Sequence, residues 1–241
     1  MNFEGVNKAQ RVRMDFIQTR PTYKAKPLGQ TSRVWIATVC KHTAHLHDLA
    51  EHDPYHPGWT DLISVLMDQF EILTHAGFTF EFVEQEEPYA GGQQLINAVE
   101  VGHVKIAKTP DGHFKRSPNV GALHPFSGRA PIGFVRPCSI KGITSINYND
   151  VFRAVHDVLG HGAAQVGFGL LGEYMAWRSH AATMPHLDAL RPLAGETLMQ
   201  VGYWFTHRKF AEQKAVIAPE DLIKEDLTKC TRTLPITVLH P

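Results

Sequence analysis

The period of the apolar residues changes abruptly at Gly77, and this change limits the folds open to the chain. Between Trp59 and Ala76 the apolar residues recur every three or four positions, which predicts an amphipathic helix with one buried face. Gly77 stands where a glycine commonly ends a helix. From Phe78 to Glu84 apolar and polar residues alternate, as in a half-buried strand. A helix followed at once by a strand predicts an α+β fold.

The first half of the chain contains further signals of both kinds. A shorter helix is predicted at residues 93–101, and a second strand at residues 103–108 is closed by the turn signal Pro-Asp-Gly. Residues 34–40 are apolar and rich in β-branched side chains but run into a segment that suits a helix, so strand and helix both stay open there. We therefore expect a small sheet with helices in the N-terminal half.

The second half is predicted to be mainly helical and to carry the functional site. Helices are expected at about residues 150–159, at residues 170–183 before Pro185, and from about residue 194 towards residue 217. The histidine motif described below lies at the end of the first of these helices.

Two segments are predicted to lack regular structure. Residues 109–142 are rich in Gly and Pro, and a loop of this length in a compact domain is usually functional. It carries His124, a catalytic candidate, and Arg129, and is predicted to cover a pocket and exclude water. Residues 1–32 are polar and contain two prolines, which predicts an extended N-terminal arm.

Composition excludes several classes of function. Lys plus Arg and Asp plus Glu both number 24, so the net charge is zero and no nucleic-acid surface is indicated. No apolar run approaches the roughly 18 residues that span a bilayer, and the first residues lack the apolar core of a signal peptide. The three cysteines, Cys40, Cys138 and Cys230, are widely spaced, which indicates reduced thiols rather than a disulfide framework. We expect a soluble cytoplasmic protein.

Residues 151–162, Val-Phe-Arg-Ala-Val-His-Asp-Val-Leu-Gly-His-Gly, carry the strongest chemical signal. Neutral imidazole is the commonest protein ligand of metals, and His156 and His161 lie five residues apart here. On a regular helix they would diverge by about 140°. Gly160 and Gly162 allow the last turn to unwind and bring His161 round. The segment therefore predicts a metal site in which both histidines are ligands.

One carboxylate would complete a facial triad with open positions, and the pattern leaves its identity open. Glu173 and Glu196 both lie on the helices that follow. Glu173 and His180 are two turns apart, about 10.5 Å along one helix, so we expect one to bind the metal and the other to support it. Asp157 is placed to orient a ligand or to bind the metal itself. Asp157, Glu173 and His180 are therefore catalytic candidates.

A second group of histidines lies nearer the N-terminus. Its members are His42, His45, His47, His52 and His56. Pro54 and Pro57 break any long helix there, so this group predicts a metal site less strongly than the pair does.

The run His156-Asp-Val-Leu-Gly-His161 resembles the iron-binding motif of the pterin-dependent aromatic amino acid hydroxylases. A second run, Tyr203-Trp-Phe-Thr206, resembles one found in the same family. This resemblance implies an Fe(II) site with both histidines as ligands and Glu196 as the third.

Two other resemblances bear on the same motif. Residues 156–162 are similar to the HD-type phosphohydrolases, whose His-Asp pair binds metal, which implies metal-dependent hydrolysis. Over residues 88–219 the chain resembles a poorly characterised group of phage and bacterial proteins with the pattern Phe-Arg-Ala-Val-His-Asp-x-x-Gly-His. The other matching places are His124-Pro125, Glu173 with Ala176-Trp177 and His180, Glu196-Thr197 with Gln200, and Phe210 with Gln213-Lys214. No activity is established for that group, so it implies a shared site without naming a reaction.

These signals favour a metal-dependent enzyme formed by residues 33–241 as a single α+β domain. The leading hypothesis is a non-haem Fe(II) oxygenase that acts on a small-molecule substrate, with Glu196 or Glu173 beside the histidine pair. The alternative is a hydrolase that uses zinc or manganese to activate water. A further alternative is a non-catalytic domain stabilised by metal, and a homo-oligomer is compatible with each of these hypotheses.

Overall fold

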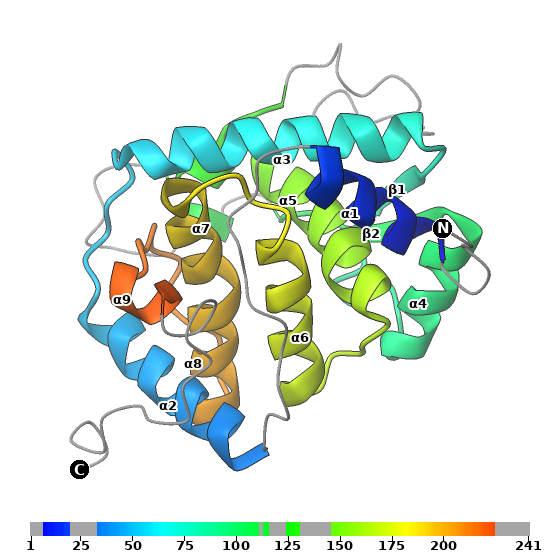
Figure 1. Cartoon of the computed structure of the whole chain (residues 1–241). Coiled ribbons are helices and arrows are strands. Elements are labelled where there is room, and N and C mark those ends of the chain that lie inside the picture. The colour runs from blue at the N-terminus through cyan, green and yellow to red at the C-terminus, as the bar shows by residue number, and fades with distance from the viewer. Residues whose placement is uncertain (1–6, 20–32, 111–112, 116–123, 131–145, 225–241) are drawn as a thin grey trace.

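A long helix, α3 (Pro57–His75), spans one side of the molecule, and the helices of the C-terminal half lie beneath it (Figure 1). The computed structural model describes residues 7–19, 33–110, 113–115, 124–130 and 146–224. Proline in the first turn and a cap from His56, whose ring accepts the N–H of Gly58, fix where α3 begins. The predicted helix at residues 59–76 is thus confirmed.

A parallel strand–helix–strand unit lies at one end of α3. It consists of β1 (Thr79–Val83), α4 (Gly92–Val101) and β2 (His103–Ala107), and Thr79 pairs with His103 in the parallel register. Gly102, at φ 83°, caps α4 and leads directly into β2, a conformation that glycine adopts without strain. The fold is α+β, mostly helical with a small sheet, as the sequence predicts.

The segment that the sequence left open between strand and helix is the helix α2 (Arg33–Leu49). It packs along α8 (Gln200–His207), where a Cβ on Gly202 would collide with the Thr43 hydroxyl, so only glycine permits this approach. None of the described helices combines the length and the apolar character that a membrane span requires.

Residues 8–19 form a helix, α1 (Lys8–Thr19), so the prediction of an extended arm is wrong for this part. Phe16 is buried, the Asn7 amide donates to the carbonyl of Gly162 at 3.1 Å, and Nε of Arg13 donates to the carbonyl of Ser179 at 3.0 Å. These contacts are to the second half of the chain, which a local pattern does not reveal. The rest of the predicted arm, residues 1–6 and 20–32, lies outside the described residues.

The C-terminal half is helical from Tyr148 to His207 with short connections. Its elements are α5 (Tyr148–Val155), the π-helix η4 (His156–Gly162), α6 (Leu170–Ala181), α7 (Leu187–Ala194), the π-helix η5 (Gly195–Met199), α8, and the short α9 (Glu220–Ile223). Helices α5 and α7 contact α3, and α6 contacts η4.

The last predicted helix begins and ends earlier than expected. It starts at Leu187 and stops at His207, because Arg208 adopts a left-handed conformation (φ 54°) and its N–H bonds to the carbonyl of Trp204. The residues after His207 contact the segment between α2 and α3, since the N–H of Asp53 donates to the carbonyl oxygen of Ala215 at 2.9 Å. The prediction of a helix towards residue 217 is therefore wrong.

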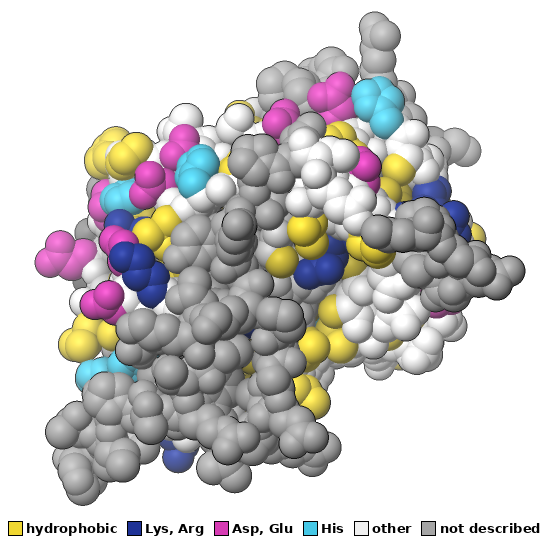
Figure 2. Space-filling view, viewed as in Figure 1, with side chains coloured by type: hydrophobic (Ala, Val, Ile, Leu, Met, Phe, Trp, Pro, Cys, Tyr) yellow, Lys and Arg dark blue, Asp and Glu magenta, His cyan; other side chains and the backbone are white. Residues whose placement is uncertain are grey.

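Two short 3₁₀-helices, η1 (His113–Lys115) and η2 (Pro125–Ser127), are described within the Gly- and Pro-rich loop. Most of the loop predicted to cover the pocket lies outside the described residues. On the face shown in Figure 2, basic side chains of the described residues are interspersed with acidic ones and with histidines. This mixture agrees with the zero net charge.

Candidate metal centre

The segment that carries the two histidines is a wide helical turn. Helix α5 begins with a reciprocal cap, in which the Asn147 side chain accepts the N–H of Asp150 at 2.9 Å and the Asp150 carboxylate accepts the N–H of Asn147 at 3.0 Å. The helix continues without a break into the π-helix η4. A π turn closes its hydrogen bonds five residues on, so His161 lies about one turn beyond His156.

The histidines therefore meet because the turn widens, and the loosening predicted for the last turn takes the form of a π-helix. Their rings lie edge to face, with centroids 5.2 Å apart. Gly160 lies against the His156 ring, where a Cβ would stand 3.1 Å from Cε1 and Nδ1 of that ring. The sequence thus supplies a residue without a side chain where the ring needs room.

Helix α6 brings a carboxylate to the pair. Oε2 of Glu173, in the first turn of α6, lies 3.5 Å from Nε2 of His161. Ser179, further along α6, donates to the carbonyl of Leu159 at 2.6 Å and ties α6 to η4. One ligand atom from each of His156, His161 and Glu173 lies within 4.8 Å of the other two. Three donors this close match a set that holds one metal ion.

The ring nitrogens on the far side of both histidines have partners. Nδ1 of His161 lies 3.1 Å from the carbonyl oxygen of Val166, and because a carbonyl only accepts, this Nδ1 carries the proton. Nδ1 of His156 lies 3.2 Å from Nδ1 of His180. Metal-binding histidines usually donate their second N–H to such a partner. The structure places His180 against His156 rather than within the group of three donors.

The charges around the group favour a cation. Burial, then the charges of His161 and His180, hold the pKa of His156 well below its usual value. Burial acts to lower the pKa of His161 too, but Glu173, Asp157 and the carbonyl of Val166 together outweigh it, so this pKa is raised. Burial, with repulsion from Glu173, raises the pKa of Asp157 to about 6. The charge of Glu173 thus acts on a buried Asp157, and a bound cation would relieve that repulsion.

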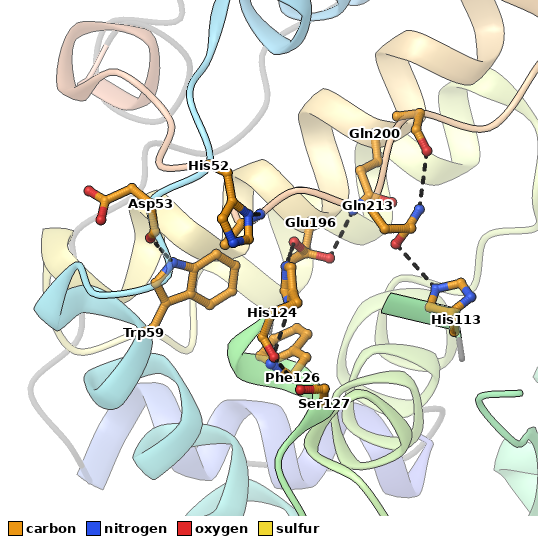
Figure 3. A network of polar contacts seen from close by, with 12 residues as sticks. His52, Asp53, Trp59, His113, His124, Phe126, Ser127, Glu196, Gln200 and Gln213 are labelled. Carbon is orange, nitrogen blue, oxygen red and sulfur yellow. Dashed lines mark hydrogen bonds and ion pairs between the residues drawn. The ribbon is translucent and has the colours of Figure 1, made fainter. Parts of the chain in front are cut away.

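Glu196, the third ligand that the hydroxylase resemblance implies, lies in a separate polar network (Figure 3). Its Oε1 accepts from Nε2 of His124 at 3.1 Å, and its Oε2 accepts from Gln200 at 2.9 Å. Nδ1 of His124 accepts the N–H of Phe126 at 3.1 Å, which leaves the ring proton on Nε2 for the carboxylate. The carboxylate beside the histidine pair is therefore corrected to Glu173. Both nitrogens of His124, a predicted catalytic group, are occupied by protein partners.

An aromatic stack separates this network from the histidine pair. Ring centroids are 5.6 Å apart between His124 and Phe126, 5.3 Å between Phe126 and Phe152, and 5.6 Å between Phe152 and His156. Both phenylalanines are buried. The residues that were predicted to form one site therefore form two polar groups, with the buried rings of Phe126 and Phe152 between them.

Gln69, which lies on α3 and is fully buried, was not predicted to belong to the site. Its Oε1 lies 3.2 Å from Nε2 of His180. The sequence contained a signal for this residue, because Gln69 shares the apolar face of the predicted helix with Leu62, Leu66 and Leu73.

A second group of potential ligands lies at the surface, where α3 and α7 begin: Asp61, His186 and Asp188.

Comparison with known proteins gives no relative of this chain. No protein-family model, no curated protein and no solved structure matches it. The resemblances of the histidine motif therefore stay predictions, and the geometry of the site is the support for any function.

Proposed function

We propose that the chain is a metal-dependent enzyme with a non-haem Fe(II) site formed by His156, His161 and Glu173, which uses dioxygen on a small-molecule substrate. The observation that carries the proposal is the convergence of the three donor atoms within 4.8 Å of one another. Two imidazoles and one carboxylate are the donor set of the facial-triad iron enzymes. When bound, iron in such a site offers open positions for O₂ and substrate.

The surrounding residues support this role in distinct ways. Glu173 supplies a negative charge, and its side chain is 17% exposed, so the group is not sealed from outside. The ring of Phe152 stacks on His156, and Phe168 lies edge-on to His161 with centroids 5.2 Å apart. These rings limit the access of water to the two imidazoles, which strengthens electrostatic interactions within the site.

Metal-dependent hydrolysis is the second candidate, because two histidines and a glutamate also form catalytic zinc sites. Asp157, directly after His156, is the carboxylate available to accept a proton from a bound water. A purely structural zinc site is normally closed by four ligands and often includes cysteine. The described group has three donors and no cysteine, which disfavours that role.

Metal content tests the proposal directly. Protein purified without chelator or affinity-tag metal is reconstituted anaerobically with Fe(II), Zn(II) or Mn(II), and bound metal is quantified. We expect one Fe(II) per chain, lost in His156→Ala, His161→Ala and Glu173→Gln. The matched control is His103→Ala, which removes a half-exposed histidine on β2. Retention of iron by all three variants would overturn the site.

Oxygen chemistry needs a second readout. Nitric oxide, a probe for open positions on Fe(II), is added to the reconstituted protein, and electron paramagnetic resonance is recorded. A stoichiometric iron–nitrosyl signal supports the oxygenase, and O₂ uptake is then screened with small-molecule substrates. Tight binding of zinc alone, with no nitrosyl signal, overturns the iron proposal in favour of hydrolysis.

A further inference from the structure

A chain of hydrogen bonds runs from His156 into the core. Nδ1 of His156 faces Nδ1 of His180 at 3.2 Å, and Nε2 of His180 faces Oε1 of Gln69 at 3.2 Å. Nε2 of Gln69 donates to Oγ1 of Thr183 at 2.8 Å. Gln69 and His180 are fully buried, and Thr183 is 3% exposed. These hydrogen bonds therefore connect α3 to the candidate metal centre through protein groups alone.

The hydrogen bonds of Thr183 determine which atom donates and which accepts in each of these contacts. Thr183 donates its only hydroxyl proton to the carbonyl oxygen of His180 at 2.6 Å, so its Oγ1 can only accept from Gln69. The amide nitrogen of Gln69 therefore faces Thr183, and its amide oxygen faces His180. Since an amide oxygen only accepts, the ring proton of His180 lies on Nε2.

The same logic fixes the proton on His156. Two N–H groups cannot face each other at 3.2 Å, so one of the two facing Nδ1 atoms carries a proton and the other accepts it. A neutral imidazole carries one ring proton. With the proton of His180 on Nε2, its Nδ1 is an acceptor and must receive the proton on Nδ1 of His156. Nε2 of His156 is then left with a free lone pair. A ring whose tautomer is fixed in this way presents the same nitrogen at all times.

We propose that Gln69 is a positioning residue that fixes His156 in the tautomer with an unprotonated Nε2. Gln69 acts through His180 and does not itself belong to the group of three donors. The consequence for metal binding rests on the proposed function, because the free Nε2 is the nitrogen that would bind the metal. The tautomer is a property of the metal-free protein and is measured independently.

The test is nitrogen-15 NMR of the imidazole rings in metal-free full-length protein at neutral pH. Long-range proton–nitrogen correlations distinguish protonated from unprotonated ring nitrogens, and His156→Gln and His180→Gln spectra assign the signals. We expect His156 to be protonated at Nδ1 and His180 at Nε2. A wild-type His156 that is protonated at Nε2, or that averages between tautomers, overturns the proposal without any variant of Gln69.

Two substitutions of Gln69 sharpen the test. Gln69→Met keeps a similar volume but removes both partners, so His156 should shift towards the tautomer with Nε2 protonated. Gln69→Glu should preserve the wild-type tautomer, because burial favours the neutral acid, whose O–H donates to Oγ1 of Thr183 while its carbonyl oxygen accepts from His180. Leu66→Ala is the matched control, because it opens a cavity one turn earlier on α3 without touching the chain of hydrogen bonds.

Metal affinity is the second readout. We expect Gln69→Met to weaken Fe(II) binding by about tenfold, the lower end of the range for loss of a direct partner of a liganding histidine, because Gln69 acts through His180. Gln69→Glu and Leu66→Ala should change it little. If Gln69→Met keeps the wild-type tautomer and affinity, the proposal fails. If the tautomers are as expected and no metal binds to the wild type, the proposed function fails and the positioning role stands.

Discussion

Oε2 of Glu173 lies 3.5 Å from Nε2 of His161, whereas the carboxylate of Glu196 is held by His124 and Gln200. The two glutamates therefore have different tasks. The carboxylate of Glu173 is a partly exposed candidate metal ligand beside the histidine pair. The carboxylate of Glu196 is buried and accepts hydrogen bonds from His124 and Gln200. Their neutral variants should affect different properties of the protein.

Glu173→Gln should abolish metal binding with little effect on the stability of the metal-free protein. The amide is a poor metal ligand, and the side chain it replaces is partly solvated. Metal binding is followed by titration calorimetry and stability by urea denaturation.

Glu196→Gln should show the opposite pattern. An amide offers only one acceptor oxygen, so either His124 or Gln200 loses its acceptor in a buried place. We expect a loss of about 1–3 kcal/mol in the free energy of unfolding, with metal affinity retained. Loss of metal in Glu196→Gln and its retention in Glu173→Gln would reverse the assignment of the two glutamates.

Gly160→Ala and Gly162→Ala should separate the metal site from the fold. A Cβ on Gly160 would stand 3.1 Å from the His156 ring, so we expect weaker metal binding as that ring is displaced. A Cβ on Gly162 would stand 2.5 Å from Cγ1 of Val99 on α4, so we expect a loss of stability of about 1–3 kcal/mol from overpacking. The metal dissociation constant and the thermal unfolding of both variants test this expectation. Equal effects of the two substitutions on metal affinity would contradict it.

Helix α1 should contribute to stability, although it lies in the segment predicted to be an extended arm. Phe16→Ala removes a buried ring and should cost about 3 kcal/mol in the free energy of unfolding. Gln18→Ala, at an exposed position two residues on, is the control and should be nearly neutral. Equal urea midpoints for the two variants would indicate that α1 does not pack in solution.

His47 should make the protein less stable in acid. Burial, with repulsion from Lys214, lowers the pKa of His47 to about 4. Between pH 6.5 and 4 the unfolded chain therefore binds a proton that the folded chain does not, so stability falls as the pH falls, by up to about 1.4 kcal/mol per pH unit. Urea denaturation of metal-free wild type and His47→Gln measures the difference. A wild-type slope no steeper than that of the variant would show that His47 titrates normally.

Local patterns were sufficient for the elements around Gly77 and Gly102. Helices α3 and α4 have one apolar face, β1 and β2 alternate, and each glycine marks an end with a positive φ. These features depend on neighbours in the sequence, so their boundaries fall within a few residues of those expected. The prediction of α2 stayed open because its first residues suit either a strand or a helix.

The site depends on packing between distant segments, which a single sequence does not encode in a readable way. The sequence offered two carboxylates, and the choice of Glu173 follows from the contact of α6 with η4. The helix α1 was missed because its hydrogen bonds, from Asn7 to Gly162 and from Arg13 to Ser179, are to residues far along the chain. In the sequence, Gln69 is recognisable only as a polar residue on the apolar face of a predicted helix.

The π-helix η4 relates this centre to a commoner arrangement. Metal sites on α-helices often use two histidines four residues apart, which share one face. The pair here is five apart on a turn that closes its hydrogen bonds one residue later. The motif is therefore equivalent to the four-residue pair with one residue inserted, and the wider turn absorbs the insertion. Pattern searches restricted to the α-helical spacing would pass over it.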